Sequence, residues 1–163
     1  MEGGRKMNRQ IIEKLTGIVG RDYLLTDRQQ VSAYLYDQVE IPLRPKASEG
    51  CVVVKPASTE EVSAIVSLAS QENIPVVVRG GGTGLCGAAT PVYDSIIISM
   101  ERMNHILEID EKNMMAVMEA GVTLADLLEE LEGHEGKMCI RDSLRPSRTA
   151  SHAAAHGQGS FAA

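Results

Sequence analysis

Tryptophan is absent from this chain, and aromatic residues of all kinds make up only 3% of it. The core must therefore be built from Val, Ile, Leu, Met and Ala, whose burial removes enough apolar surface from water to stabilise a fold. The hydrophobic and charged fractions, 44% and 23%, are ordinary for a soluble globular protein. With 163 residues, the chain has room for one domain and too little for a large cofactor domain together with a substrate domain.

Basic residues are too few to form a nucleic-acid surface. The formal net charge is -6 at pH 7, and no stripe of Lys and Arg interleaved with aromatic residues is present, so we expect no nucleic-acid partner. No apolar run approaches the roughly 20 residues that span a bilayer. The start of the chain, MEGGRKMNRQ, also lacks the apolar stretch of a signal peptide. These features predict a cytoplasmic protein without a transmembrane segment.

Metal and disulfide motifs are missing as well. Three cysteines are scattered along the chain without a C-x-x-C pair, which predicts neither a disulfide framework nor a zinc site. The spacing of His134, His152 and His156 matches no metal motif, so we expect no metal ligands. His105 lies in a predicted strand, and we expect it to be structural rather than catalytic.

The chain before the first apolar run is expected to be a helical lead-in, residues 1–50. Helices are predicted over 5–15 and 26–37 from their patterns of polar and apolar residues. The following stretch, 38–50, carries two prolines and is predicted to be a loop that crosses the surface.

A strand, a helix and a strand follow in order. The β-branched run 51–55 (CVVVK) predicts a buried strand, and Ser58-x-x-Glu61 is a capping box that opens a helix. A second apolar run, 76–78 (VVV), predicts another buried strand. This order is typical of a βαβ unit, in which the two strands are parallel and the crossover is right-handed.

Three short runs and a helix complete the regular pattern. The runs are 95–100 (SIIISM), 105–109 (HILEI) and 114–119 (MMAVME), and a polar turn between the last two predicts an antiparallel pair. Thr123 is expected to cap a final helix with a stripe of leucines. From Lys137 onward the periodicity ends and the composition turns to Ala, Ser, His and Arg, so 137–163 is predicted to be disordered.

The feature most indicative of chemistry is the glycine loop, residues 79–87 (RGGGTGLCG). Glycine lets the backbone approach a ligand closely, and successive N–H groups turned to one side form a concavity that suits phosphate. Ligands of α/β sheets bind beyond the carboxyl ends of strands, where this loop is expected to lie. A diphosphate is the expected ligand of this loop. The alternative is that the segment is a mobile surface loop that binds no ligand.

Two nucleotide-binding motifs were tested against this loop. Gly82 to Gly87 satisfies the letters G-x-G-x-x-G, but a Rossmann fingerprint needs its last glycine to open a helix. Only a few residues separate Gly87 from the run SIIIS, which leaves no room for that helix. A Walker A loop needs Lys and Ser or Thr after its final glycine, and Ala88 and Ala89 stand there instead.

Three segments together resemble the FAD-linked oxidases of the vanillyl-alcohol oxidase or PCMH-type superfamily: PVVVRGGGTGLCGAATPV, SIIISMERMNHILEID and VMEAGVTLADLLEEL. The nearest branch is that of the glycolate oxidase large subunit and FAD-dependent D-lactate dehydrogenase, and the resemblance covers about residues 8–136. It implies an α+β fold, a PCMH-type FAD-binding domain over 51–136. A small parallel βαβ subdomain would be followed by the start of an antiparallel subdomain, and the domain would be truncated.

The resemblance also implies which residues hold FAD. Main-chain amides of the loop would face the diphosphate, the Thr83 hydroxyl would add a donor, and Pro56 would border the adenine. The implied cofactor-binding residues are Pro56, Val78, Arg79, Gly80, Gly81, Gly82, Thr83, Gly84, Leu85, Cys86 and Gly87. Some relatives attach flavin covalently through a His in an R-x-G-G-H loop. Thr83 stands at that position, so the implied FAD is non-covalent. Cys86 is expected to serve packing, with a redox role as the alternative.

For the full-length parent, the resemblance implies oxidation of a 2-hydroxy acid, with hydride transfer to flavin N5. Electrons would pass on to a quinone, an electron-transferring flavoprotein or an iron–sulfur subunit. The substrate domain of such enzymes is missing from the sequence, so we expect the printed chain to hold FAD weakly or not at all, to be inactive, and to carry no catalytic residue.

The alternatives are another PCMH-type flavoenzyme, such as alkylglycerone-phosphate synthase or a sugar-lactone oxidase, and a non-catalytic nucleotide-binding module. KMCIRDS at 137–143 back-translates to a transposon end used in library preparation, which gives the hypothesis that the tail 137–163 is an artefact.

Overall fold

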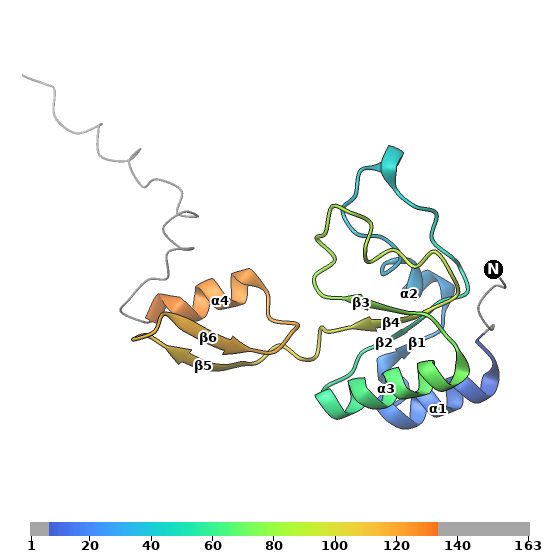
Figure 1. The fold of residues 1–163 in the computed structure, drawn as a ribbon, viewed down its shortest axis with the longest axis horizontal. Coiled ribbons are helices and arrows are strands. Elements are labelled where there is room, and N and C mark those ends of the chain that lie inside the picture. Colours follow the sequence, from blue (N-terminus) through green and yellow to red (C-terminus); the bar gives the residue numbers. More distant parts are fainter. Residues whose placement is uncertain (1–6, 134–163) are drawn as a thin grey trace, which may run out of the picture.

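The computed structural model describes residues 7–133, which form a four-stranded sheet between helices and a separate two-stranded sheet under one helix (Figure 1). The larger sheet has the order β1-β2-β4-β3. Its strands are β1 (Leu24–Leu25), β2 (Val52–Val54), β3 (Val76–Arg79) and β4 (Ile96–Ser99). β2, β4 and β3 are parallel, and β1 is antiparallel to β2. The predicted parallel arrangement is confirmed, with β4 inserted between the two strands of the βαβ unit.

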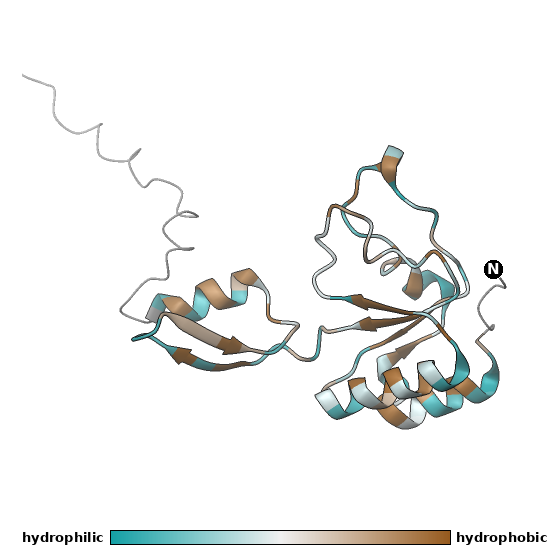
Figure 2. Cartoon of the chain, viewed as in Figure 1, coloured by the Kyte–Doolittle hydropathy of each residue, from teal (hydrophilic) through white to brown (hydrophobic). Residues whose placement is uncertain are grey.

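The core lies on both faces of this sheet. Successive side chains of a strand point to opposite faces. Ile96 and Ile98 of β4 therefore pack with helices α1 (Arg9–Val19) and α3 (Thr59–Glu72), while Ile97 packs with Val31 of α2 (Arg28–Ser32) on the other face. All three isoleucines are fully buried, and each contributes about 1.5–3 kcal/mol through burial. Figure 2 shows the apolar residues gathered on the strands of this sheet.

Both predicted N-terminal helices were wrong in their bounds. α1 begins four residues later than expected, because Asn8 caps it by accepting a hydrogen bond from the amide of Ile11, and it ends at Gly20, whose φ is 85°. α2 covers only Arg28–Ser32. After it the amides of Tyr34 and Leu35 bond three residues back rather than four, so the chain leaves the helix before Asp37.

The edges of the sheet also differ from expectation. β1 was not predicted, because two residues are too short to show an alternating pattern. β3 was predicted to be a buried strand, but it is an edge strand, and the side chain of Val78 is 57% exposed. The lead-in contributes β1 and α1 to this unit, so contacts cross residue 50. The division at that residue stays a prediction.

The smaller sheet is the predicted antiparallel pair, β5 (Ile106–Asp110) and β6 (Met115–Met118). Helix α4 (Leu124–Glu130) lies over it, and Thr123 caps this helix in a capping box with Asp126. Short 3-10 helices lie at Arg21–Tyr23, Ile41–Leu43 and Leu131–Gly133 within the described residues. Within residues 7–133, every helix is too short or too polar to cross a membrane. The predicted disorder of 137–163 lies outside the described residues.

Candidate functional site

The glycine loop leaves the carboxyl end of β3, at the edge of the sheet where β2 and β4 also end. Parallel strands present their carboxyl ends along one edge, and ligands of α/β sheets bind there. The amide of Met100, just after β4, donates to the carbonyl of Arg79 over 3.0 Å, which fixes the start of the loop against its neighbour. The loop therefore lies where the sequence placed it.

The main-chain amides of the loop are unused. None of the eight amides from Gly80 to Gly87 donates a hydrogen bond to another group within residues 7–133. Most of these residues are exposed. A run of unpaired N–H groups at a strand end is a ready site for an oxyanion. This is an arrangement that a diphosphate fits.

The glycines of the loop fall into two kinds. Gly82 has a φ of 68°, and a Cβ added there would overlap the guanidinium of Arg79. Gly80 has nothing within 4 Å of such a Cβ, and Gly81 has only the methyl group of Thr83 at 3.9 Å. The protein itself does not require glycine at 80 and 81. The space that side chains would fill there is open, so a ligand can approach the backbone of the loop closely.

The Arg79 side chain packs against the loop itself, beside Gly82, and is held there by residues that follow α2. Its Nη1 donates to the carbonyl of Tyr36 over 2.9 Å, and its guanidinium stacks 5.7 Å from the ring centroid of Tyr34. No carboxylate of residues 7–133 forms an ion pair with it. Arg79 therefore places an uncompensated positive charge under the loop, which favours an anion on the loop's open side.

A second loop, residues 36–48, supports the glycine loop; most of it lies in the predicted crossing loop 38–50, but this contact was not predicted. The amide of Gln38 donates to the carbonyl of Gly84 over 2.9 Å, and Pro45 lies 3.1 Å from where a Cβ of Gly87 would be. Asp37 is buried beside Gly84. The two prolines predict a loop here, but no local signal in the sequence shows its contact with the glycine loop.

The ends of β2 and β4 carry a polar network of their own. Lys55 forms an ion pair with Glu101 over 2.8 Å, and Arg102 donates to the carbonyl of Lys55. Burial disfavours the charge of Lys55, but hydrogen bonds to Glu101 and Tyr34 outweigh it and raise the Lys55 pKa. Burial likewise disfavours the Glu101 carboxylate, but hydrogen bonds from Lys55, Tyr34 and Ser99 lower its pKa. Both groups are held in their charged forms.

The N-terminus of α3 reaches the same edge but is already occupied. The amide of Ala57 donates to the Glu61 carboxylate over 2.8 Å, and the amide of Glu61 donates to the Ser58 hydroxyl. The predicted capping Ser58 is thus confirmed as the N-cap. Because its own carboxylate fills this helix end, the glycine loop is the better anion site of the two.

The other residues that the resemblance implies for FAD binding differ in their exposure. The side chains of Thr83, Leu85 and Cys86 are exposed on the loop, with Leu85 at 71%. Pro56 is fully buried at the end of β2. Its contact with adenine, like the role of each loop residue toward FAD, stays a prediction.

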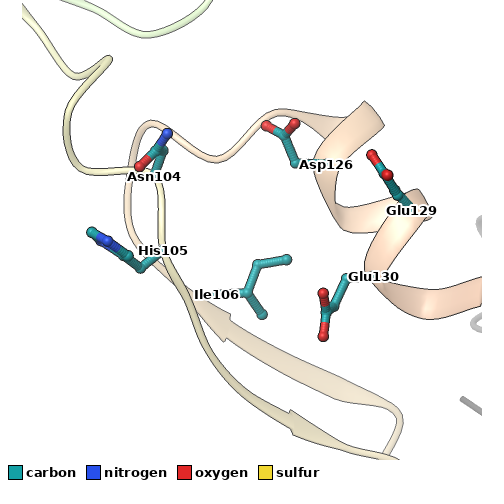
Figure 3. A pocket seen from close by; sticks show the side chains of 6 residues that line it. All are labelled: Asn104, His105, Ile106, Asp126, Glu129 and Glu130. Carbon is teal, nitrogen blue, oxygen red and sulfur yellow. The ribbon is translucent and has the colours of Figure 1, made fainter. Parts of the chain in front are cut away.

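A hollow of about 430 Å³ lies away from this edge, between the start of β5 and α4 (Figure 3). Helix α4 lines it with three acidic side chains, Asp126, Glu129 and Glu130. Their negative charges would repel a phosphate ligand. The ring of His105 points away from α4 in Figure 3, and its Nδ1 pairs with Glu119 over 2.6 Å. This contact fits the expected structural role of His105.

Known proteins share both the sequence and the fold. The D-lactate dehydrogenase of Archaeoglobus fulgidus is 48% identical over 95 residues, which are 58% of this chain and 21% of that protein. Glycolate oxidase subunit GlcD of Bacillus subtilis is 39% identical over 80 residues, 49% of this chain and 17% of that protein. The chain thus spans about a fifth of the length of these relatives.

Among solved structures, p-cresol methylhydroxylase with substrate bound superimposes with a TM-score of 0.64 at 23% identity, covering 75% of this chain and 24% of that one. This likeness confirms the predicted PCMH-type fold. Residues 51–163 match the family described as FAD binding domain. The match runs past residue 136, and the boundary expected there stays a prediction. The parallel sheet, the glycine loop at its carboxyl edge and this match agree, and the chain belongs to the FAD binding domain family.

Proposed function

We propose that the glycine loop binds the diphosphate of FAD through the main-chain amides of Gly80 to Gly84. The observation that carries this proposal is that the amides of this loop are unused within residues 7–133. Several N–H groups directed at one anion replace the water that a phosphate loses on binding. The charge of Arg79 behind the loop adds to the attraction.

We propose further that FAD is held non-covalently. The side chain of Thr83 stands where covalent relatives carry histidine, so the imidazole nitrogen that forms their flavin bond is absent at this position. Thr83 is exposed on the loop, so its hydroxyl is free to reach a phosphate oxygen.

For the whole protein we propose oxidation of a 2-hydroxy acid, because the two curated relatives are named for lactate and glycolate. Bound FAD would supply the acceptor for the hydride, and electrons would leave to a quinone, an electron-transferring flavoprotein or an iron–sulfur partner. In this reaction, the role of residues 7–133 would be to bind and orient the cofactor. We expect the chain alone to turn over no 2-hydroxy acid.

The test compares two glycine variants of the whole protein in FAD titrations followed by flavin fluorescence, because the chain alone is expected to hold FAD weakly or not at all. A Cβ at position 81 would meet no protein atom closer than 3.9 Å, so Gly81→Val adds its side chain in open space beside the loop. We expect it to weaken FAD binding by about tenfold or more, since one lost charged hydrogen bond alone is worth that much. Gly17→Ala is the control, because Gly17 lies in α1 and also has free space around it.

Equal FAD affinities of Gly81→Val and the unaltered whole protein would refute the assignment of the loop. NAD and ATP are titrated in parallel. If either binds as tightly as FAD, the loop is a general nucleotide site, and the flavoenzyme proposal is wrong.

A further inference from the structure

Three buried side-chain polar atoms within residues 7–133 lack a hydrogen-bond partner: Asp37 Oδ2, Arg44 Nε and Thr90 Oγ1. All three come from the glycine loop's continuation or from the loop 36–48 that lies against it. A buried polar atom without a partner costs free energy, so unpaired atoms gathered at one place indicate that a polar group from outside the chain belongs there.

Asp37 is the strongest of the three. Its side chain is 95% buried, since only 5% of it is exposed. One carboxylate oxygen, Oδ1, accepts from the amide of Val39 over 3.2 Å. The other, Oδ2, lies 3.4 Å from where a Cβ of Gly84 would stand, at the end of the amide run proposed for the diphosphate.

Neither neighbouring arginine supplies the missing donor. Arg79 donates to the carbonyl of Tyr36, and Arg44 donates to the carbonyl of Val39 over 3.3 Å. No ion pair joins Asp37 to a cation within residues 7–133. A phosphate oxygen cannot serve either, because it is itself a negatively charged acceptor. The group that satisfies Oδ2 must bring a hydrogen to donate, and the donors that a dinucleotide carries beside its diphosphate are sugar hydroxyls.

We propose that Asp37 recognises the sugar part of the dinucleotide: its Oδ2 accepts a hydrogen bond from a hydroxyl of the polyol next to the diphosphate. The proposal rests on the diphosphate assignment made above. FAD carries a polyol on each side of its diphosphate, the ribose of the adenosine half and the ribityl chain of the flavin half. Both present hydroxyl donors, and Asp37 lies beside Gly84, the last residue of the amide run proposed for the diphosphate.

The experiment measures the affinity of the chain for pyrophosphate, ADP, FMN and FAD by calorimetry, with and without Asp37→Asn. In this variant the amide oxygen still accepts from Val39, while an NH2 group replaces Oδ2. We expect FAD binding to weaken by about tenfold, because hydrogen bonds to a charged acceptor are the strong ones. Loss for ADP identifies the ribose as the donor, and loss for FMN identifies the ribityl chain.

Pyrophosphate is the internal standard, because it has phosphates and no hydroxyl-bearing carbon. Its affinity is expected to stay the same or to rise in Asp37→Asn, since a negative charge near the loop is removed. Glu40→Gln is the matched control, as Glu40 is an exposed carboxylate of the same supporting loop. We expect it to leave all four affinities within about twofold, because exposed charges are well screened.

Two results would overturn the proposal while leaving the diphosphate site intact. An equal loss for pyrophosphate and for the sugar-bearing ligands would mean that Asp37 only shapes the loop. No loss for any ligand would mean that water alone satisfies Oδ2. If the unaltered chain did not bind pyrophosphate, the diphosphate assignment itself would fail, and this proposal with it. Asp37→Ala, checked for folding by thermal unfolding, repeats the comparison should Asp37→Asn not fold.

Discussion

The guanidinium of Arg79 fills the place under Gly82 that a side chain would otherwise take. The two residues are three apart, and the loop turns back over its own first side chain at a φ of 68°. Glycine at position 82 is therefore favoured by the protein's own backbone, whereas glycine at 80 and 81 leaves open space beside the loop. The same run of small residues serves two separate physical purposes.

Gly82→Ala tests the first purpose. An added methyl group would both meet Arg79 and force an L-residue into left-handed backbone, so we expect a loss of about 1–3 kcal/mol in the free energy of unfolding. Chemical denaturation followed by circular dichroism measures this loss. Gly80→Ala is the matched variant, and its stability is expected to lie within about 0.5 kcal/mol of the unaltered chain. Equal destabilisation by both variants would contradict the distinction.

Arg79→Met tests the charge beneath the loop. Methionine keeps much of the apolar stem but loses the hydrogen bond to the Tyr36 carbonyl and the positive charge. We expect pyrophosphate affinity to fall and to become less sensitive to salt, because a fixed charge attracts anions over a range that salt screens. Titrations at low and high ionic strength measure both effects. Arg79→Lys keeps the charge and is expected to restore most of the salt dependence; the same slope in all three proteins would count against a role for this charge.

Elements of the fold could be predicted from the sequence where they depend on residues close together in the chain. The β-branched run of β2, the Ser58 cap of α3 and the turn between β5 and β6 each follow from residues close in the chain, and all three are present. The position of the glycine loop followed from its place after a strand. No local pattern, however, shows that β4 separates β2 from β3 and leaves β3 at the edge.

The burial of Asp37 could not be predicted from its neighbours in the sequence. Its residue type is common on helix surfaces, and the predicted helix 26–37 would have left it exposed. In the structure the helix ends at Ser32, and contacts with Gly84, 47 positions away in the chain, bury the carboxylate. Contacts of this range depend on the packing of two loops, which neither propensity nor spacing encodes.

The ion pair of Lys55 and Glu101 predicts a dependence of stability on pH. The Glu101 pKa lies below its ordinary value of 4.5, so its contribution is present above that value and is lost as pH falls through the lowered pKa. The Lys55 pKa lies above 10.5, so its contribution is present below that value and is lost as pH rises through the raised pKa. Between these limits we expect Glu101→Gln to cost up to about 1 kcal/mol, because Glu101 is half exposed.

Denaturation across the pH range checks this expectation. The difference between Glu101→Gln and the unaltered chain should be largest near neutral pH and shrink toward strong acid and strong base. Glu108→Gln, at an exposed carboxylate of β5, controls for the loss of one negative charge. A difference that stays constant from acid to base would show that Glu101 acts through packing and not through its charge.

Gly121 is expected to be the most sensitive glycine outside the loop. It follows β6, and its amide donates to the carbonyl of Met103 over 2.7 Å, which ties the smaller sheet to the chain leaving β4. A Cβ there would overlap the carbonyl oxygen of Met100 and lie 2.8 Å from that of Met103. Both neighbours are backbone, so neither can turn aside as a side chain does. We therefore expect Gly121→Ala to cost more than about 2 kcal/mol, in the range of overpacking. Hydrogen exchange should show the loss in β5 and β6 first, whereas unchanged protection there would mean that the two sheets are joined by other contacts.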